Sequence, residues 1–593
     1  MTDDSLEPPV VATGLLAEFA IAGAISWSGV HLARTLSWLT GEQQPEVLLA
    51  VALCLGAQES GSVCLPIGEA HPATGGLAWP ETTAWLALLT DSPLIAVGAG
   101  PPANQRPLRL VGEQLYLERN WQSEESVRLA LTSRIAMPPP ALDQRLLDDS
   151  LAAAARQWAG GPELTAAQRD AVRTSLSSWT SVIAGGPGTG KTTTIAQLLR
   201  VLDDLTPTRT SVALASFTGK AAARMQQSLD ASLAHDDHRG PGWKHLQVRP
   251  ATTLHALLGA RPGGRMTRDA DNPLPHDLLV IDEMSMVSLD LMAAVMAALR
   301  PTTRLVLVGD PHQLSSVDAG AVLADIVSAG LPIAGGRPDS AITELTYSHR
   351  FAGPIQQLAD AVLGARTGDA LELLCSSGEE LSWIDTDPEP QMIATVESLN
   401  ADVVSQGQAM VSAARHGDPA AALAAVDAHR LLCAHRQGRY GVGGWSRAAE
   451  AELRRTIPGY GREGEWYLGR PLLVTRNAPD LRISNGDTGV VVRIDGQTQV
   501  ALSSGDRPRL RSPWLLDSTE TMHAMTVHKS QGSEYDAVTL VLPTPDSALL
   551  TRELLYTAIT RARQRVRIIG SADAITQAIN TPARRATGLG RRL

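Results

Sequence analysis

A glycine-rich segment that ends in a lysine and a threonine offers the clearest chemistry in this sequence. Residues 185–192 read Gly-Gly-Pro-Gly-Thr-Gly-Lys-Thr and lie between an apolar run, 181–184, and a helical run, 193–202. This G-x-x-x-x-G-K-[ST] pattern closes backbone N–H groups around phosphates at a helix N-terminus, where the helix dipole favours negative charge. We predict that Lys191 reaches the β- and γ-phosphates and that the Thr192 hydroxyl binds Mg²⁺. The predicted nucleotide-binding residues of this loop are Gly185, Gly186, Pro187, Gly188, Thr189, Gly190, Lys191, Thr192 and Thr193.

Two later apolar runs end in polar residues that would complete such a site. Residues 278–282 place Asp282 at the carboxyl end of a buried strand, and Glu283 follows directly. Because that edge of a parallel sheet lies beside the phosphate loop, we expect Asp282 to hold Mg²⁺ and Glu283 to polarise the attacking water. The run 304–310 leads to Gln313, whose amide is expected to sense a γ-phosphate or to orient water. An amide that caps a turn is the alternative interpretation of Gln313.

Parallel sheets are needed to position these residues. Short apolar runs alternate with helix-length segments, which is the βαβ pattern of an α/β fold. The first series includes residues 180–184, 211–215, 278–282 and 304–308, and the second includes 429–434 and 537–542. A segment from about 470 to 520, rich in Val, Gly, Asp and Arg, interrupts the second series and contains the turn signal Asn485-Gly486-Asp487. It predicts a small β-barrel insert.

Residues 1–137 have a different character from the rest of the chain. This region has an apparently helical pattern and holds six arginines, no lysine and 14 acidic residues. The run Pro138-Pro139-Pro140 predicts a stiff linker after it, since three prolines cannot continue a helix. We therefore predict a mainly helical N-terminal domain at 1–137, a first α/β domain at 150–340 and a second at 341–593. The last ten residues, which hold four arginines, are interpreted as a solvated tail.

Length and composition limit the class of protein. A chain of 593 residues is long enough for about three to five domains, and a hydrophobic content of 44% excludes disorder as its main state. A net charge of −11 argues against a protein that coats DNA through bulk charge. No apolar stretch reaches 18 residues and no basic segment opens the chain, so we expect neither a membrane span nor a secretion signal. The four cysteines lack C-x-x-C spacing and are expected to be reduced thiols of a cytoplasmic protein.

Lysine usage adds a sharper signal. Only four of the 51 basic residues are lysines, at positions 191, 220, 244 and 529. Arginine stands wherever a positive charge suffices, so the lysines are candidates for sites that need a compact ammonium group. Three of the four fall within the motifs described here.

The motifs form an ordered series along the chain. Gln168 comes first, then the phosphate loop, Thr-Gly-Lys-Ala-Ala-Ala-Arg at 218–224, Thr-Thr-Leu-His at 252–255 and Asp282-Glu283. They are followed by residues 309–314, Ser-His-Arg-Phe at 348–351, Thr-Val-His-Lys-Ser-Gln-Gly-Ser-Glu at 526–534 and Tyr-Thr-Ala-Ile-Thr-Arg-Ala-Arg at 556–563. The series resembles superfamily 1 helicases, and within them the RecD family, the alpha subunit of exonuclease V (RecBCD), over roughly residues 105–593. Phe217 stands where relatives usually have proline, and His349 where an aromatic residue is common, which leaves DNA stacking there open.

The resemblance implies an ATP-dependent 5′→3′ translocase with two RecA-like motor domains and an SH3-like insert in the second. ATP and Mg²⁺ would bind between the motors, with Arg350 and Arg561 as arginine fingers, Gln168 at the adenine and Glu534 at the ribose. Single-stranded DNA, the 5′-ended strand of a duplex end, would cross both motors. The predicted DNA contacts are Thr218, Lys220, Thr253, His255, Asn485, Thr526, His528 and Lys529. A surface role for either arginine and a core role for either histidine remain the alternatives.

Partners follow from the same resemblance. It implies a heterotrimer with RecB-like and RecC-like subunits that acts at double-strand break ends in recombinational repair, with the N-terminal domain docked on the RecC-like subunit. The N-terminal region fits this role, because no Lys or Arg lies between Arg34 and Arg106 and five of the 12 tryptophans lie within 1–137. Tryptophans that fill a small helical core are the alternative explanation.

Two other functions compete with this interpretation. A self-sufficient RecD-like helicase would usually carry a longer N-terminal extension with helix–hairpin–helix repeats, which this sequence does not display. A phosphate-loop ATPase that remodels proteins would explain Asp282 and Glu283 but neither 218–224 nor 526–534. Stimulation of ATP hydrolysis by single-stranded DNA separates the classes. We expect no nuclease activity, because no further acidic and lysine cluster stands outside the motor motifs.

Overall fold

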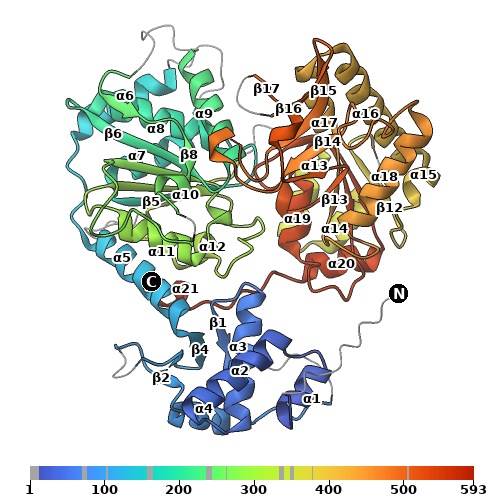
Figure 1. Ribbon diagram of the computed structural model, residues 1–593. Helices are drawn as coiled ribbons and strands as arrows, with labels where there is room; N and C mark the ends of the chain where they lie inside the picture. The colour runs from blue at the N-terminus through green and yellow to red at the C-terminus, as the bar shows by residue number, and fades with distance from the viewer. Residues whose placement is uncertain are drawn as a thin grey trace.

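The protein folds into three units, an N-terminal unit and two α/β units (Figure 1). The computed structural model describes residues 12–69, 76–101, 105–156, 164–234, 243–261, 263–332, 340–347, 353–376, 378–481, 483–503 and 507–593. Two α/β units stand side by side and the N-terminal unit lies below them (Figure 1). The chain ends beside a helix of residues 118–136, where Arg592 pairs with Glu124, and not beside the helices of the second α/β unit that precede it in sequence (Figure 1).

The N-terminal unit combines helices with a small sheet. Its helices are α1 Leu15–Ile21, α2 Trp27–Thr40, α3 Pro45–Glu59, α4 Thr82–Asp91 and α5 Glu118–Ala136. Within the described residues its strands are β1 Cys64–Pro66, β2 Ile95–Val97, β3 Leu108–Val111 and β4 Gln114–Leu117, in the order β1-β4-β3-β2. The predicted helical character is confirmed. The sheet was not anticipated, because strands of three or four residues are too short to show a period of two.

The first α/β unit contains a parallel sheet that follows the predicted strands. Its strands are β5 Thr180–Gly185, β6 Thr210–Ser216, β7 Leu246–Val248, β8 Thr252–Thr253, β9 Leu278–Asp282, β10 Arg304–Gly309 and β11 Ile342–Leu345. The order is β11-β5-β10-β9-β6-β7, with β8 also paired to β6. Its helices are α6 Gln144–Arg156, α7 Ala166–Ser177, α8 Lys191–Leu205, α9 Gly219–Ala234, α10 Leu254–Leu257, α11 Leu289–Ala298 and α12 Val322–Ala329.

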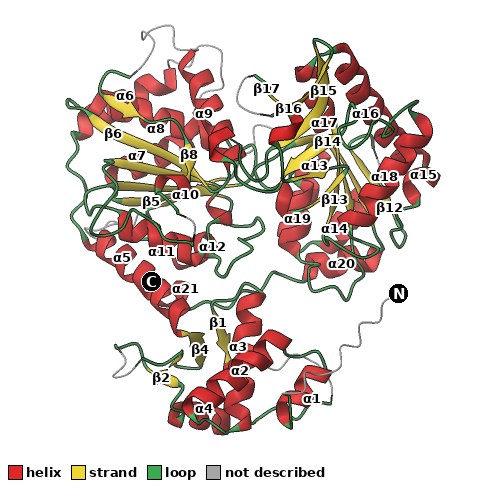
Figure 2. Cartoon of the chain, in the orientation of Figure 1, coloured by secondary structure: helices red, strands yellow, loops and turns green. Residues whose placement is uncertain are grey.

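Alternating side chains bury both faces of this sheet. Leu278 and Val280 pack with α6, α7, α8 and α9, whereas Leu279 and Ile281 pack with α11, α12 and α5. The strands read as continuous apolar runs because each face is covered by helices. Figure 2 shows this arrangement, with yellow strands as a central layer between red helices.

The second α/β unit repeats the architecture and carries the insert. Its strands are β12 Leu381–Ile384, β13 His429–Cys433, β19 Ala524–Thr526, β20 Tyr535–Val541 and β21 Ala562–Ile569, all parallel, in the order β12-β21-β20-β13-β19. Its helices are α13 Pro354–Leu363, α14 Thr367–Cys375, α15 Met392–Thr395, α16 Glu397–His416, α17 Pro419–Ala428, α18 Val442–Thr456, α19 Arg552–Ile559 and α20 Ala572–Asn580.

The predicted β insert is an antiparallel sheet. It comprises β14 Pro471–Val474, β15 Thr488–Ile494, β16 Gln497–Leu502, β17 Arg509–Arg511 and β18 Thr519–Thr521, in the order β17-β16-β15-β14-β18. The predicted turn at Asn485 and Gly486 lies just before β15, where the Asp487 N–H donates to Ser484 O at 3.1 Å. A second turn joins β15 to β16 through Asp495 and Gly496, both with positive φ, as a two-residue hairpin requires.

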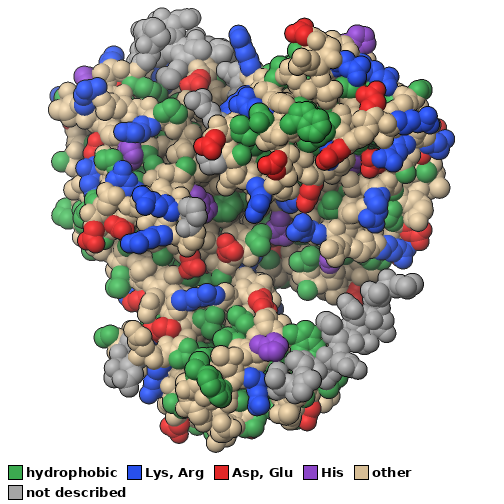
Figure 3. All heavy atoms as spheres, viewed as in Figure 1, with side chains coloured by type: hydrophobic (Ala, Val, Ile, Leu, Met, Phe, Trp, Pro, Cys, Tyr) green, Lys and Arg blue, Asp and Glu red, His purple; other side chains and the backbone are tan. Residues whose placement is uncertain are grey.

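The last residues of the chain are ordered, so the interpretation as a solvated tail is wrong. After α20 the chain leaves the second α/β unit and reaches α21 Leu589–Arg592, which packs on α12 and α5. Ala586 O accepts the Val63 N–H at 2.8 Å, and Leu589 is fully buried. The segment runs between the N-terminal unit and the two α/β units (Figure 1), where the space-filling view narrows (Figure 3). The arginines by themselves predicted an exposed segment. In the folded protein Arg592 pairs with an acidic side chain and Arg585 donates to backbone carbonyls, and these partners are distant in sequence.

Candidate nucleotide and DNA site

The phosphate loop connects β5 to α8, as the sequence predicted. Gly188 and Gly190 have φ of 78° and 81°, a region that residues with a Cβ rarely adopt. The Lys191 Nζ lies folded into the loop and donates to Gly185 O at 2.7 Å and Gly186 O at 2.8 Å. α8 begins at Lys191, so the free N–H groups of its first turn face the same space as the ammonium group. The loop can therefore bind phosphate through backbone and side-chain donors together.

Asp282 and Glu283 stand at the carboxyl end of β9, across from the loop. The Asp282 Oδ1 accepts the Glu283 N–H at 2.8 Å. Glu283 has a φ of 56°, and holding a non-glycine residue in that region costs on the order of 1–3 kcal/mol, a cost that is typical of functional sites. Burial, and then the charge of Glu283, raise the pKa of Asp282 to about 6, while the charges of Lys191 and Arg224 oppose this rise.

The donor set at this edge fits Mg²⁺ carried by a nucleotide. Mg²⁺ is usually held by one or two protein oxygens together with phosphate oxygens and water, and not by a complete protein cage. Asp282 and Thr192 supply one carboxylate and one hydroxyl at the same cavity. Among the described residues, no group of three or more His, Cys, Asp or Glu side chains could hold a metal by itself.

Gln313 lies at the cavity beside Asp310. Its Nε2 donates to Asp310 Oδ2 at 3.1 Å, and its buried Oε1 has no hydrogen-bond donor among the described residues. The Tyr556 hydroxyl, from the second α/β unit, donates to the same Asp310 oxygen at 3.0 Å. Nearby, the Leu314 N–H donates to Thr557 Oγ1 at 2.9 Å, which also crosses between the units. Asp310 therefore holds the nitrogen of the Gln313 amide, and the amide oxygen can accept a hydrogen bond from a ligand in the cavity.

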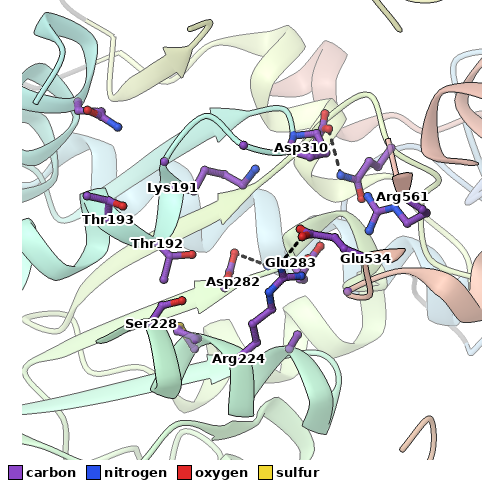
Figure 4. Close-up of a pocket in the computed structure, with 18 residues that line it drawn as sticks. Lys191, Thr192, Thr193, Arg224, Ser228, Asp282, Glu283, Asp310, Glu534 and Arg561 are labelled. Carbon is purple, nitrogen blue, oxygen red and sulfur yellow. Dashed lines mark hydrogen bonds and ion pairs between the residues drawn. The ribbon is translucent and has the colours of Figure 1, made fainter. Parts of the chain in front are cut away.

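One cavity of about 410 Å³ collects these residues from both α/β units. Figure 4 shows Lys191, Thr192 and Asp282 on one side and Glu534 and Arg561 on the other. Arg561 is 3% exposed, and it donates to Thr557 O at 3.1 Å and Ser533 O at 3.3 Å. The predicted residues that line the cavity are Gln168, Pro187, Gly188, Gly190, Lys191, Thr192, Thr193, Asp282, Glu283, Gln313, Glu534 and Arg561.

Gln168 is bound to the protein through both ends of its amide. Its Oε1 accepts the Thr165 N–H at 2.9 Å in a capping box at the start of α7, and its Nε2 donates to Thr189 O at 3.2 Å. The side chain thus connects α7 to the phosphate loop. The predicted contact with adenine would have to use the remaining hydrogen-bonding capacity of this amide.

Helix α9 supplies a wall of the cavity that the sequence analysis missed. Ala221, Arg224, Met225 and Ser228 line the cavity together with Asp310. None of these five was predicted as a site residue. Arg224 belongs to the motif at 218–224, so the motif carried a signal. Residues 221, 224, 225 and 228 share one face of α9. This spacing would have predicted that the helix contributes side chains to the nucleotide cavity as well as to the DNA contacts.

The predicted DNA contacts of the first unit lie at two adjacent strand ends. Thr218 precedes α9 and its Oγ1 accepts the Ala221 N–H at 3.1 Å, while Thr253 caps α10 through the Ala256 N–H at 3.2 Å. The two segments meet because β6 pairs with β8. The exposed His255 ring lies edge-on to Phe217, with ring centroids 6.0 Å apart. These side chains therefore share one edge of the sheet.

Three candidates of the second unit, Thr526, His528 and Lys529, lie at the end of β19 or directly after it. Thr526 Oγ1 accepts the Lys529 N–H at 3.2 Å, and Lys529 Nζ lies 3.3 Å from Glu520 Oε2. Burial, and then the charge of Arg585, lower the pKa of His528. A second cavity of about 380 Å³ is lined by Thr526, Lys529 and residues of α18 and β18. A neutral, partly buried His528 suits a hydrogen-bonding role better than a charged contact.

The two sets of candidates are brought together at the start of α9. A Cβ at Gly532 would stand 3.5 Å from Thr218 Oγ1, and a Cβ at Gly219 would overlap Ser484 Oγ of the insert. Lys220 and Ser484 line one cavity, and the exposed Asn485 follows Ser484 directly. The segment 526–534, the insert and α9 converge on one place. The predicted second arginine finger, Arg350, lies outside the described residues.

Two parallel-sheet units that share one nucleotide cavity, with a phosphate loop on one unit and an arginine on the other, define a nucleotide-driven motor of the helicase class. Three family descriptions match the chain: an AAA domain over residues 168–319, a UvrD-like helicase C-terminal domain over 521–569, and the N-terminal domain of RecBCD enzyme subunit RecD over 22–116. The chain belongs to the RecBCD enzyme subunit RecD family.

Two relatives that align with this chain over nearly their whole length support this assignment. The chain is 44% identical over 589 residues to the RecBCD enzyme subunit RecD of Mycolicibacterium smegmatis, covering 97% of this chain and 98% of that protein. It is 42% identical over 600 residues to the protein of that name from Mycobacterium tuberculosis, covering 98% and 97%. It is also 29% identical over 544 residues to the ATP-dependent RecD2 DNA helicase of Deinococcus radiodurans, covering 88% of this chain and 65% of that protein.

Across the described part of the chain, no helix combines the length and apolar character needed to cross a membrane.

Proposed function

We propose that this chain is the ATP-dependent helicase subunit of a RecBCD-type helicase–nuclease and moves 5′→3′ along single-stranded DNA. One observation supports this most directly: the phosphate loop and Arg561, from different α/β units, line the same cavity. Hydrolysis in such a cavity alters the contact between the units, and the predicted DNA contacts lie on both of them. The substrate is the 5′-ended strand of a duplex end, as in recombinational repair at double-strand breaks, which places the protein in the cytoplasm.

The chemistry follows from the residues around the cavity. Lys191 and the loop N–H groups would bind the phosphates, while Thr192 and Asp282 would hold Mg²⁺, which would supply positive charge at the phosphate oxygens. Glu283 accepts a proton from the attacking water, and the Gln313 oxygen, which has no donor among the residues that the structure describes, orients that water. Arg561 places its guanidinium where charge develops in the transition state.

The same cavity is connected to the DNA contacts through short elements. Lys220 and Arg224 lie one turn apart on α9, so one helix carries a DNA candidate and a cavity residue. The segment 526–534 does the same in the second unit, from Thr526 to Glu534. Opening or closing of the cavity thus shifts two DNA-binding segments relative to each other, which is the requirement for stepping along a strand.

Hydrolysis assays with DNA test this function. We expect single-stranded DNA to stimulate ATP hydrolysis strongly, and a duplex with a 5′ overhang to be unwound in preference to one with a 3′ overhang. A rate that DNA leaves unchanged would favour a protein-remodelling ATPase. Unwinding from the 3′ overhang alone would reverse the proposed direction.

We further propose that the N-terminal unit binds a RecC-like subunit, in a heterotrimer that also contains a RecB-like subunit. Trp38 is 82% exposed on α2, with Leu39 beside it at 62% and Ile21 of α1 at 69%. Exposed tryptophans of this kind are typical anchors of protein interfaces. Trp85 lies in the core of the unit, and Trp27 and Trp79 pack against that core, so the alternative of a tryptophan-filled core applies to these three residues but not to Trp38.

Point substitutions test the docking surface better than removal of residues 1–137, because α5 is part of the core of the first α/β unit. Trp38→Ser should abolish co-purification with the partner subunits while DNA-stimulated hydrolysis by the isolated chain persists. Trp514→Ser is the matched control, since Trp514 is 83% exposed on the insert. Equal loss of assembly in both variants, or in neither, would contradict the assignment of this surface.

A further inference from the structure

Helix α19 of the second α/β unit contacts the loop between β10 and α12, which carries Gln313. The Tyr556 hydroxyl on this helix donates to Asp310 Oδ2 at 3.0 Å. The next residue, Thr557, accepts the Leu314 N–H on its Oγ1 at 2.9 Å. Tyr556, Asp310 and Gln313 are all buried. The second unit thus holds the loop on both sides of Gln313.

The Asp310 carboxylate decides which end of the Gln313 amide is turned toward it. Asp310 Oδ1 accepts the His312 N–H at 3.0 Å, and Oδ2 accepts Gln313 Nε2 at 3.1 Å in addition to the Tyr556 hydroxyl. A carboxylate only accepts hydrogen bonds, so it binds the amide nitrogen and repels the amide oxygen. The buried Gln313 Oε1, which has no donor among the described residues, therefore points away from Asp310. Both side chains line the nucleotide cavity, so a ligand there can reach this oxygen.

The Tyr556 hydroxyl lies in a narrow space against the phosphate loop. A Cβ at Gly186 would stand 2.9 Å from the Tyr556 oxygen and 3.9 Å from Asp310 Oδ2, so glycine at this position leaves room for the hydroxyl. Burial, and then the charge of Asp310, raise the pKa of Tyr556 well above its usual value, so the hydroxyl keeps its proton and remains a donor. Two donors, one from each unit, occupy both lone pairs of Asp310 Oδ2. Rotation of this carboxylate would therefore break its contact with the second unit.

We propose that Tyr556 is a positioning residue for ATP hydrolysis: through Asp310 it holds the Gln313 amide so that Oε1 faces the nucleotide. The inference rests on the proposed function, since it takes the cavity to be the ATP site and Gln313 to orient the attacking water. Because Tyr556 belongs to the second unit, Gln313 is oriented only while the two units are in contact. The same helix also places Arg561, whose Nε donates to Thr557 O at 3.1 Å. Contact between the units thus sets the amide and the guanidinium together, and a nucleotide bound to separated units is hydrolysed slowly.

Removal of a single hydroxyl tests the proposal. Steady-state ATP hydrolysis at saturating single-stranded DNA is measured for the wild type, Tyr556→Phe, Gln313→Ala and the double variant. Tyr556→Phe keeps the ring in the core and loses only a hydrogen bond to a charged group. It should lower kcat about tenfold, with a KM within about threefold of the wild type, because the contacts with the nucleotide remain. In the Gln313→Ala background the same substitution should lower kcat by less than about twofold, because the two residues act as one unit.

Tyr535→Phe is the matched control. Tyr535 is fully buried in the second unit, and its hydroxyl donates to Met525 Sδ at 3.1 Å, within the same unit. This variant loses one buried hydroxyl but no contact with the loop of Gln313, so its kcat should stay within about twofold of the wild type. An unchanged kcat in Tyr556→Phe, or an equal loss in Tyr535→Phe, would overturn the proposal. The same would follow if Tyr556→Phe lowered kcat equally in the wild-type and Gln313→Ala backgrounds.

Failure of the proposed function would be seen separately. A wild type whose hydrolysis is not stimulated by single-stranded DNA would contradict that function, while the four proteins could still be compared by their basal hydrolysis. Stimulated hydrolysis with independent effects of the two substitutions would overturn only the positioning role of Tyr556. A wild type that hydrolyses no ATP under any condition would overturn both.

Discussion

The nucleotide cavity and the contact of α21 with α5 and α12, which we call the junction, both contain charged residues. The two places differ in the hydrogen-bond partners that these residues have. In the cavity, the buried Gln313 Oε1 has no donor among the described residues, and Lys191 donates to two carbonyls of its own loop. At the junction, the fully buried Glu124 accepts from Tyr116 at 3.2 Å, Thr587 at 3.0 Å and the Gly588 N–H at 3.1 Å, in addition to an ion pair with Arg592.

The difference separates a site prepared for a ligand from one that holds the fold. A buried polar group without a partner is costly, so it persists only where something else compensates, such as bound phosphate or water. Glu124 needs nothing further, since four protein donors surround it. The Arg592 guanidinium also lies 4.2 Å from the Trp121 ring centroid, which completes its contacts. Substitutions in the cavity should therefore affect turnover, and those at the junction should affect stability.

The largest expected effect is at the phosphate loop. Lys191→Ala should abolish ATP hydrolysis and leave binding of single-stranded DNA largely intact, because it removes the point charge on the β- and γ-phosphates. Lys191→Arg should fail almost as badly, since the bulkier guanidinium does not fit an ammonium site. Lys244→Ala is the control: Lys244 is 58% exposed, lies outside the motifs and pairs loosely with Asp204 at 3.7 Å. Hydrolysis by Lys191→Ala within a few-fold of the wild type would refute the assignment of the loop.

Arg561→Ala should have the next largest effect. We expect kcat to fall by roughly 100-fold or more while nucleotide affinity changes only a few-fold, because an arginine finger acts on transition-state charge. Steady-state rates and equilibrium nucleotide binding measure the two quantities separately. Arg565→Ala, which breaks ion pairing with Asp402 away from the cavity, should leave kcat near that of the wild type. If affinity were lost and kcat kept, Arg561 would act on the bound ground state instead.

Glu124→Ala should destabilise the fold by about 3 kcal/mol, since it leaves Arg592, Thr587 and the Gly588 N–H without their buried acceptor. Urea denaturation gives the change as a shift of the first unfolding transition, and hydrolysis by the folded fraction should stay close to normal. Glu125→Ala removes a neighbouring carboxylate that is 20% exposed and also pairs with Arg592. That control should cost less than about 1 kcal/mol. Equal losses in the two variants would show that the buried network does not stabilise the junction.

The smallest effect is a pH dependence at the same junction. Burial raises the pKa of Asp325 on α12 from 3.8 to about 7, with the charge of Glu124 adding to the rise and a hydrogen bond with Thr587 opposing it. Because the folded state holds this proton more tightly, its stability falls as pH rises from about 4 to about 7 and then levels off. Asp325→Asn should therefore stabilise the protein by roughly 1 kcal/mol at pH 8, a value reduced because the Asp325 carboxyl is partly exposed to solvent. The stabilisation should become progressively smaller toward pH 4. A constant difference across this range, in urea denaturation, would rule out the carboxyl as the cause.

Much of the fold could be predicted because its signals are local. The strands β5, β9 and β10 are continuous apolar runs, and β9 ends at Asp282, the residue expected there. The phosphate loop needs glycines at Gly188 and Gly190, and both occupy positive φ. The short strands of the N-terminal unit and the order of the tail lay beyond such signals. β1 pairs with β4 across about fifty residues, a contact that no local pattern encodes.

The candidate site divides in the same way. The sequence by itself determined which residue types stand at each strand end. These types indicate the ligands of the site, because a phosphate, a divalent cation and a water molecule each require particular donors and acceptors at fixed spacing. Only the tertiary structure decided that Arg224 meets Glu534 and that Glu124 meets Arg592, since these pairs are separated by hundreds of residues. A side chain's charge is set by its type, but its partner, burial and orientation depend on which elements pack beside it. For this reason the arginine-rich end of the chain, which suggests a solvated tail in sequence, is a packed connection between units in the fold.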